Sequence, residues 1–145
     1  MIAHREGRLA GTKPRCPLER VKFDLSDLEE RKQLFDRISS GSKRVLVITE
    51  GLLFYLTEGD VALLGADLCA QQDFHWWIID ILLQELLDFL TKRSYRQFPE
   101  GNVVMEFAPV EGSVFFGRYG WGVDEQRSVG EEARSLKREM PGAGF

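Results

Sequence analysis

The order of apolar and polar positions along the chain predicts three strands separated by helices. Arg44–Thr49 holds the unbroken apolar run V-L-V-I, which is typical of a strand buried on both faces. Phe74–Ile79 is aromatic and β-branched, and it predicts another strand. Leu18–Asp24 contains the alternating pattern V-K-F, which predicts a strand near the start of the chain.

Helices are predicted after each of these strands. Ser26–Ser39 opens with the capping-box pattern S-D-L-E, which favours a helix there. Thr57 and Asp60 repeat that spacing at the start of a helix expected over Glu58–Gln71. Ile81–Lys92 is strongly apolar around a narrow polar face, so we expect a largely buried helix.

The last third of the chain predicts a looser arrangement. Ser94–Gly112 is interrupted by proline and glycine and is expected to have little regular structure. A short helix over Ser113–Tyr119, a strand over Gly122–Arg127 and a charged helix over Glu131–Arg138 are expected to follow. The alternation of strands and helices indicates an α/β fold with a parallel sheet and crossover helices.

Length and composition are those of one globular domain. The chain has 145 residues, of which we expect 1–17 to form an irregular or helical lead-in and 18–145 the domain itself. The net charge of −4 gives no support for a nucleic-acid partner, because such surfaces are normally basic. Phe74–Leu90 is too short and too charged for a membrane span, so no membrane partner is expected.

The cysteines and histidines suggest neither a metal site nor a disulfide framework. Cys16 and Cys69 lie far apart without ligand-like spacing, which favours a reducing, cytoplasmic location. His75 lies within a predicted strand and is interpreted as a packed core residue rather than a base, and the Trp76-Trp77 pair as core. No phosphate-binding loop, dinucleotide fingerprint or nucleophile elbow is present, and no catalytic residue is identified.

Two carboxylates occupy equivalent places in the predicted sheet. Asp24 ends the first predicted strand and Glu50 ends the next, so both are expected at the carboxyl edge, where open α/β sheets bind ligands. A carboxylate there accepts strong hydrogen bonds from amino or hydroxyl groups of a ligand. The alternative is structural: Asp24 only satisfies backbone donors at the start of the next helix, and Glu50 only ends a strand.

Three stretches together resemble a known family. They are E-R-V-K-F-D-L-S-D, R-V-L-V-I-T-E-G-L-L-F-Y-L and R-Y-G-W-G-V-D-E-Q-R-S-V-G-E-E-A-R-S-L, and the similarity extends roughly over Leu18–Met140. They resemble the leucine carboxyl methyltransferase family of S-adenosylmethionine-dependent O-methyltransferases, which have the class I, Rossmann-like fold. The resemblance implies S-adenosyl-L-methionine as cofactor and a carboxylate or hydroxyl oxygen of a small molecule or protein as methyl acceptor.

The resemblance also implies roles for individual residues. Asp24 and Leu25 match an aspartate-leucine pair that holds the adenine end of the cofactor. Glu50 matches a glutamate that lines the cofactor pocket near its reactive end, and Tyr55 matches an aromatic position on the substrate side. No metal is implied.

The chain departs from the family pattern at both ends. The family's first strand with its glycine-rich loop, its second strand and its last antiparallel strand have no counterpart in this sequence, so we expect a partial sheet. Unpaired strand edges and exposed apolar faces should follow, and with them association into homo-oligomers. Two functions are therefore expected as alternatives: a methyltransferase domain impaired by truncation, or a non-catalytic remnant that associates with another chain. Some other nucleotide-binding α/β enzyme remains a third interpretation.

Overall fold

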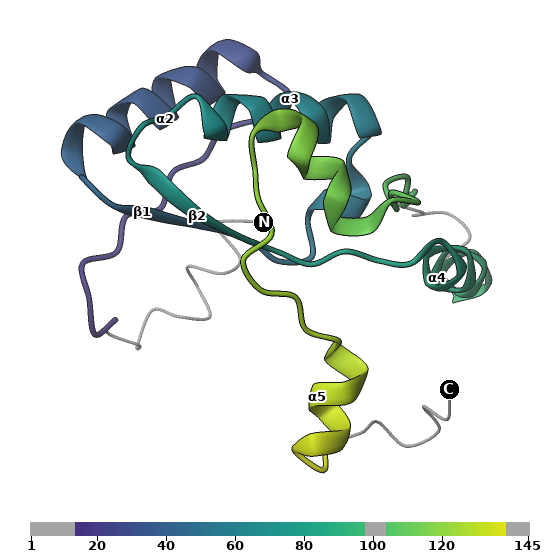
Figure 1. Cartoon of the computed structure of the whole chain (residues 1–145). Coiled ribbons are helices and arrows are strands. Elements are labelled where there is room, and N and C mark those ends of the chain that lie inside the picture. The colour runs from purple at the N-terminus through teal and green to yellow at the C-terminus, as the bar shows by residue number, and fades with distance from the viewer. Residues whose placement is uncertain (1–13, 98–103, 139–145) are drawn as a thin grey trace.

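The computed structural model describes residues 14–97 and 104–138, and it has a mixed α/β architecture (Figure 1). Helices lie over one side of a small parallel sheet, and the chain then continues past the sheet to a last short helix. The elements are, in order, α2 (Leu28–Gly41), β1 (Val45–Thr49), the 3-10 helix η1 (Leu53–Tyr55), α3 (Glu58–Cys69), β2 (Phe74–Ile79), α4 (Gln84–Gln97), the 3-10 helix η2 (Gly112–Tyr119) and α5 (Val129–Ser135).

The sheet consists of β1 and β2, which run parallel and are joined through the crossover helix α3. Val47 lies opposite Trp77 and Ile48 opposite Ile78, while the register is irregular between Val45 and Leu46. Both strands lie where the sequence predicts them, but β1 is not buried on both faces as expected, since Leu46 is 49% and Ile48 59% exposed. The α/β prediction is confirmed at this level, as one parallel strand–helix–strand unit.

The helix caps explain where α2 and α3 begin. The Thr57 side chain accepts a hydrogen bond from the backbone N–H of Asp60 (3.1 Å), as the capping box predicts for α3. In α2 the prediction was wrong by one residue. Asp27, not Ser26, caps this helix, because the Asp27 carboxylate accepts from the N–H groups of Glu29 and Glu30, both at 3.0 Å.

One hydrophobic core lies between the helices and the sheet. It is built mainly from α3, the aromatic side chains of η2 and single residues of α2 and β2. Phenylalanine rings meet edge to face within it, as in the pair Phe115–Phe116, whose centroids lie 5.2 Å apart. Its buried members are Phe35, Leu53, Val61, Leu64, Leu68, Phe74, Phe107, Phe115 and Phe116.

Two predicted strands are absent from the described residues. Leu18–Asp24 and Gly122–Arg127 have no helix or strand assignment, although their patterns favour strands. The physical reason is that a strand needs a neighbour to satisfy its backbone N–H and C=O groups. Both segments are largely exposed, so water satisfies those groups instead.

The helix predicted over Ile81–Lys92 is also different. It begins later, at Gln84, and continues to Gln97, so the irregular region expected from Ser94 starts in a helix. Its apolar residues are not enclosed: Leu87 is buried, but Phe89 is 52% exposed. Apolar spacing indicates which side chains favour burial, and within the described residues too few neighbouring elements surround α4 to bury them.

The end of the chain follows its prediction more closely. η2 covers the predicted short helix, and Gly120 after it has φ +90°, the left-handed conformation that glycine adopts readily at such ends. α5 begins at Val129, two residues earlier than predicted, because Ser128 caps it. Residues 1–13 of the lead-in and Pro141–Phe145 lie outside the described residues.

Candidate functional site

The carboxyl edge of the sheet holds two carboxylates. Glu50 follows β1 directly and is exposed, as predicted from its place in the sequence. Gly51 next to it has φ +64°, and its N–H donates to Oδ2 of Asp80 (2.9 Å), the residue that follows β2. The two strands run parallel, so Glu50 and Asp80 lie at the same edge.

Asp80 was not predicted as a site residue, although it bears the same relation to β2 as Glu50 does to β1. The sequence signal is its place directly after Phe74–Ile79. Its Oδ2 accepts from Gly51, while its Oδ1 is buried without a hydrogen-bond partner in the described residues. At this edge, Oδ1 of Asp80 can therefore accept a further hydrogen bond, and the exposed carboxylate of Glu50 lies at the same edge.

Asp24 lies in an exposed turn before α2 and ends no strand, which corrects its predicted place at the carboxyl edge of the sheet. Its Oδ1 accepts hydrogen bonds from the side-chain hydroxyl (2.6 Å) and the backbone N–H (3.0 Å) of Ser26. These bonds favour the charged carboxylate, the hydroxyl most, and they hold the pKa of Asp24 below its usual value. The structural alternative for Asp24 is thus partly realised, since it satisfies a backbone donor at the start of α2.

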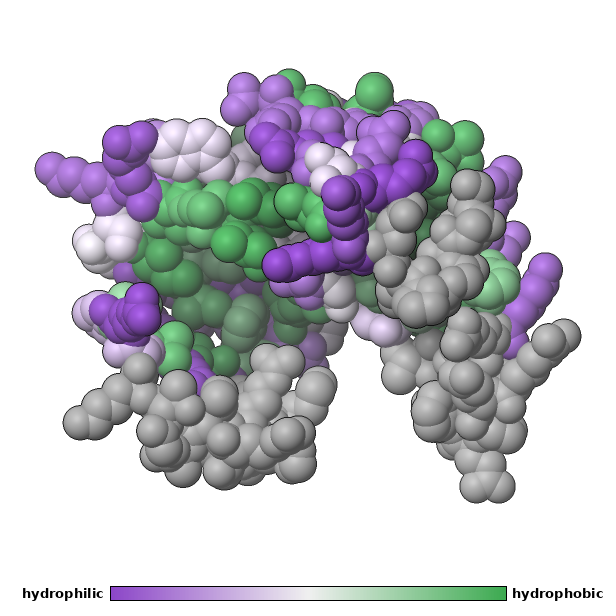
Figure 2. Space-filling view, turned by 90° about the horizontal axis from the view of Figure 1, so that it is seen from below, coloured by the Kyte–Doolittle hydropathy of each residue, from purple (hydrophilic) through white to green (hydrophobic). Residues whose placement is uncertain are grey.

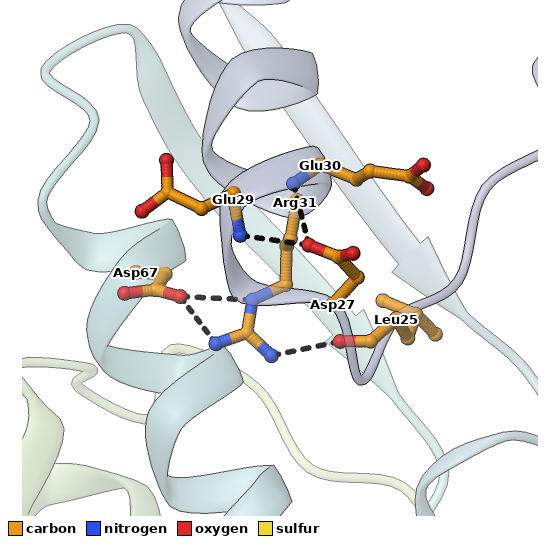
Figure 3. A network of polar contacts seen from close by, with 6 residues as sticks. All are labelled: Leu25, Asp27, Glu29, Glu30, Arg31 and Asp67. Carbon is orange, nitrogen blue, oxygen red and sulfur yellow. Dashed lines mark hydrogen bonds and ion pairs between the residues drawn. The ribbon is translucent and has the colours of Figure 1, made fainter.

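The backbone carbonyl of Leu25 is held by the buried guanidinium of Arg31 (Figure 3). Arg31 is 2% exposed, and its Nη1 donates to the Leu25 carbonyl (3.0 Å). Its Nε (2.8 Å) and Nη2 both donate to Oδ2 of Asp67 on α3, so α2, α3 and the Asp24–Leu25 turn are tied together. The sequence prediction missed Arg31, since a charged residue in a helix is usually exposed.

Beside this turn is an open hollow of about 670 Å³, lined by residues 21–25 and Glu30. Leu25 also lines a second, small hollow of about 30 Å³, together with Leu56 and Leu64. The Asp24–Leu25 pair therefore presents one charged and one apolar group side by side. That combination suits the edge and the face of a flat heterocycle.

Tyr55 lies in η1 and is 41% exposed. Its ring rests on Phe54, with centroids 4.6 Å apart, while the preceding Leu53 is fully buried and anchors the turn. The Phe54 carbonyl accepts from the N–H of Glu106 (2.8 Å), which joins η1 to the segment before η2. Within the described residues, no hydrogen bond or ion pair connects Asp24, Glu50 and Tyr55.

The remaining candidates separate into core and surface. Trp77 packs in the core as expected, but Trp76 is 43% exposed and His75 is exposed rather than packed, which corrects the prediction for both. The other histidine of the sequence, His4, lies outside the described residues. Within residues 14–97 and 104–138, no cluster of His, Cys, Asp and Glu suits a metal ion, and no helix is long and apolar enough to cross a bilayer.

Comparison of the chain with protein-family models, with curated proteins and with solved structures finds no match.

Proposed function

We propose that this chain carries part of an S-adenosyl-L-methionine-dependent O-methyltransferase domain of the class I, Rossmann-like type. The observation that carries the proposal is the carboxyl edge of the β1–α3–β2 unit, where the exposed carboxylate of Glu50 lies with Asp80. Open parallel sheets bind their ligands at this edge. The methyl acceptor would be a carboxylate or hydroxyl oxygen of a small molecule or a protein.

The proposed roles follow the chemistry that each residue offers. Asp24 and Leu25 would hold the adenine end, the carboxylate accepting from the amino group and the leucine packing on the ring. Glu50 would line the pocket near the reactive end, and Tyr55 would lie on the substrate side. Asp24 and Leu25 suit the adenine end, since with Glu30 they line the open hollow beside their turn, while Glu50 and Tyr55 lie outside that hollow.

The reaction needs positioning more than a dedicated nucleophile. When bound, S-adenosyl-L-methionine would supply the methyl group: its bond to sulfur would break as the bond to the acceptor oxygen forms, leaving S-adenosylhomocysteine, and a hydroxyl acceptor would also release its proton to water. In-line geometry and exclusion of water supply most of the acceleration for such a transfer. We propose a cytoplasmic location, where Cys16 and Cys69, both free and exposed, would stay reduced.

Calorimetric titration with S-adenosylhomocysteine tests this proposal. We expect saturable binding to the 145-residue chain and loss of that binding in Glu50→Ala. Glu85→Ala is the matched control, because it removes another exposed glutamate, at the start of α4. Binding that is absent in the folded chain, or equally strong in both variants, would reject the assignment of Glu50.

A second candidate function is supported by a different observation. Four large side chains on one face of the sheet are 43–59% exposed, namely Leu46, Ile48, Trp76 and Ile78. A non-catalytic remnant that associates with another chain, through its strand edges or this face, would cover them. A folded chain without affinity for S-adenosylhomocysteine would favour this second function.

A further inference from the structure

A hollow of about 620 Å³ lies beside β2, and none of the residues proposed for methyl transfer lines it. Five consecutive residues of the strand, His75–Ile79, line it together with Leu46 of β1. The rest of its lining comes from Trp121–Glu125 and two side chains of η2. Small-molecule sites in proteins usually have volumes of roughly 300–1,000 Å³, so the hollow is large enough for a small organic ligand.

The lining is rich in aromatic rings. All three tryptophans of the chain, Trp76, Trp77 and Trp121, take part in it. The ring of Trp77 meets those of Trp121 and Phe116 edge to face, with centroids 5.4 and 5.2 Å apart, so these rings hold one another in place. Trp76 is 43% exposed, and the guanidinium of Arg44, which does not itself line the hollow, lies 4.9 Å from its ring centroid. Such rings offer flat apolar surface and attract cations.

The charged residues of the lining are both acidic. Asp124 and Glu125 line the hollow, and no lysine or arginine of the described residues does. The charge of Glu125 is offset by Arg127, whose Nη2 lies 2.6 Å from Oε1 of Glu125. Asp124 is exposed and has no hydrogen bond or ion pair within residues 14–97 and 104–138. The lining therefore contributes one carboxylate that no neighbouring cation offsets.

Several hydrogen-bond donors of the lining are already used within the chain. The indole N–H groups of Trp77 and Trp121 donate to oxygen atoms of other residues, at 3.0 and 2.9 Å. The hydroxyl of Ser113 donates to Gln126 (2.8 Å). An anionic ligand would find few side-chain donors here and would be repelled by Asp124, whereas a cation finds aromatic surface and a free carboxylate.

We propose that this hollow binds a small organic cation of the arylalkylamine class, in which a protonated amine is attached to a flat apolar ring. The ring lies against the tryptophan side chains, and the ammonium group pairs with Asp124. Leu46 and Ile78, which are 49% and 54% exposed, add apolar contact area for the ring. This inference is independent of the methyl transfer proposed above.

Three probes of similar shape and different charge test the proposal on the full chain. They are 2-phenylethylamine, which is a cation at neutral pH, the neutral 2-phenylethanol and the anionic 3-phenylpropanoate. An NMR titration follows the indole N–H signals of the three tryptophans. We expect saturable shifts with the amine at a concentration about threefold to tenfold lower than with the alcohol, and no saturable shift with the anion.

Two substitutions separate the charge from the ring contact. Asp124→Asn should weaken binding of the amine about twofold to fivefold and leave binding of the alcohol unchanged. Glu85→Gln is the matched control, because it removes one negative charge from an exposed position on α4 that does not line the hollow. Trp76→Leu removes an exposed ring and should weaken binding of the amine and of the alcohol alike.

Each outcome decides for or against the proposal once circular dichroism shows that the variants are folded. Tryptophan signals that do not respond to the amine up to about 20 mM, the range expected for a ligand of this size, overturn it. Equal affinity for the amine and the alcohol, or tighter binding of the anion, also overturns it. An equal response of Asp124→Asn and Glu85→Gln to the amine would show that Asp124 is not its partner and would likewise overturn the proposal.

Discussion

The two faces of the sheet have similar composition and opposite surroundings. On the inner face, Trp77 donates its Nε1 to Oγ1 of Thr49 (3.0 Å) and meets the rings of Phe116 and Trp121 edge to face. On the outer face, the ring of Trp76 contacts the guanidinium of Arg44, 4.9 Å from its centroid, and the ring of His75. Within the described residues it makes no other ring contact. Figure 2 views the molecule from that outer side and shows apolar side chains gathered there.

The comparison shows what an apolar strand does and does not specify. A parallel sheet is normally covered on both faces, which is why its strands are apolar at successive positions. β1 and β2 have that sequence, but α2, α3 and η2 cover the inner face only. The sequences of β1 and β2 therefore favour a covering layer on each face of the sheet, whereas the described residues cover one face.

The largest expected effect separates the two adjacent tryptophans. We expect Trp77→Ala to lower the free energy of unfolding by about 3–5 kcal/mol, since it leaves a cavity and removes the hydrogen bond to Thr49. Trp76→Ala should cost only about 1 kcal/mol, the value of an exposed cation–π contact and a partly buried ring. Urea denaturation measures both, and equal losses would contradict the contrast between the faces.

The next test asks whether polar contacts also hold the inner side together. Arg31→Met should destabilise the chain by about 2–4 kcal/mol, because the Leu25 carbonyl and Asp67 lose their buried donor. Arg37→Met is the control: its ion pair with Glu19 is exposed and is expected to contribute about 0–1 kcal/mol. Similar chemical denaturation curves for the two variants would show that the Arg31 contacts are not buried in solution.

Substitutions on the outer face are expected to change dye binding more than the free energy of unfolding. The double variant Leu46→Thr, Ile78→Thr keeps β-branched or strand-compatible side chains and removes exposed apolar surface. We expect fluorescence of the hydrophobic dye ANS to fall, with a change in unfolding free energy of about 1 kcal/mol or less. Undiminished dye fluorescence would mean that this face is covered in solution.

The smallest expected effect concerns pH and the turn at Asp24. Its pKa is held down by Ser26, so the contribution of this carboxylate to stability is present above the unfolded-state pKa and is lost as pH falls through the folded-state value. Ser26→Ala removes the hydroxyl donor, and the pKa of Asp24 should rise toward its usual value. An NMR titration of the Asp24 carboxyl carbon in both proteins checks this, and Ser40→Ala is the control.

The fold was predictable where local signals and packing agree. β1, β2 and α3 are found where the sequence places them. Their apolar side chains find packing partners in the same chain, and Thr57 caps α3. The strands predicted over Leu18–Asp24 and Gly122–Arg127 failed for the opposite reason. Strand pairing is non-local, and a segment's own pattern says nothing about whether a partner strand is present.

The candidate site was predictable in part of its position but not in its connections. Glu50 is exposed at the end of β1, where the pattern places it, whereas Asp24 ends no strand and lies in the turn before α2. The contacts that organise the site come from Asp80 and Arg31, which reach it from β2 and α2 through bonds of long sequence separation. Such contacts depend on how the elements are placed relative to one another, and this placement cannot be predicted from periodicity and helix caps.

The distribution of tryptophans gives the protein separable optical reporters. Trp77 and Trp121 stack edge to face with centroids 5.4 Å apart beneath η2, and their coupling should produce a strong near-ultraviolet dichroic signal. Trp76 stands apart on the outer face, where acrylamide reaches it. Quenching of its emission would therefore follow whatever approaches the sheet from outside, while the dichroic band of the other pair follows the integrity of the core in the same sample.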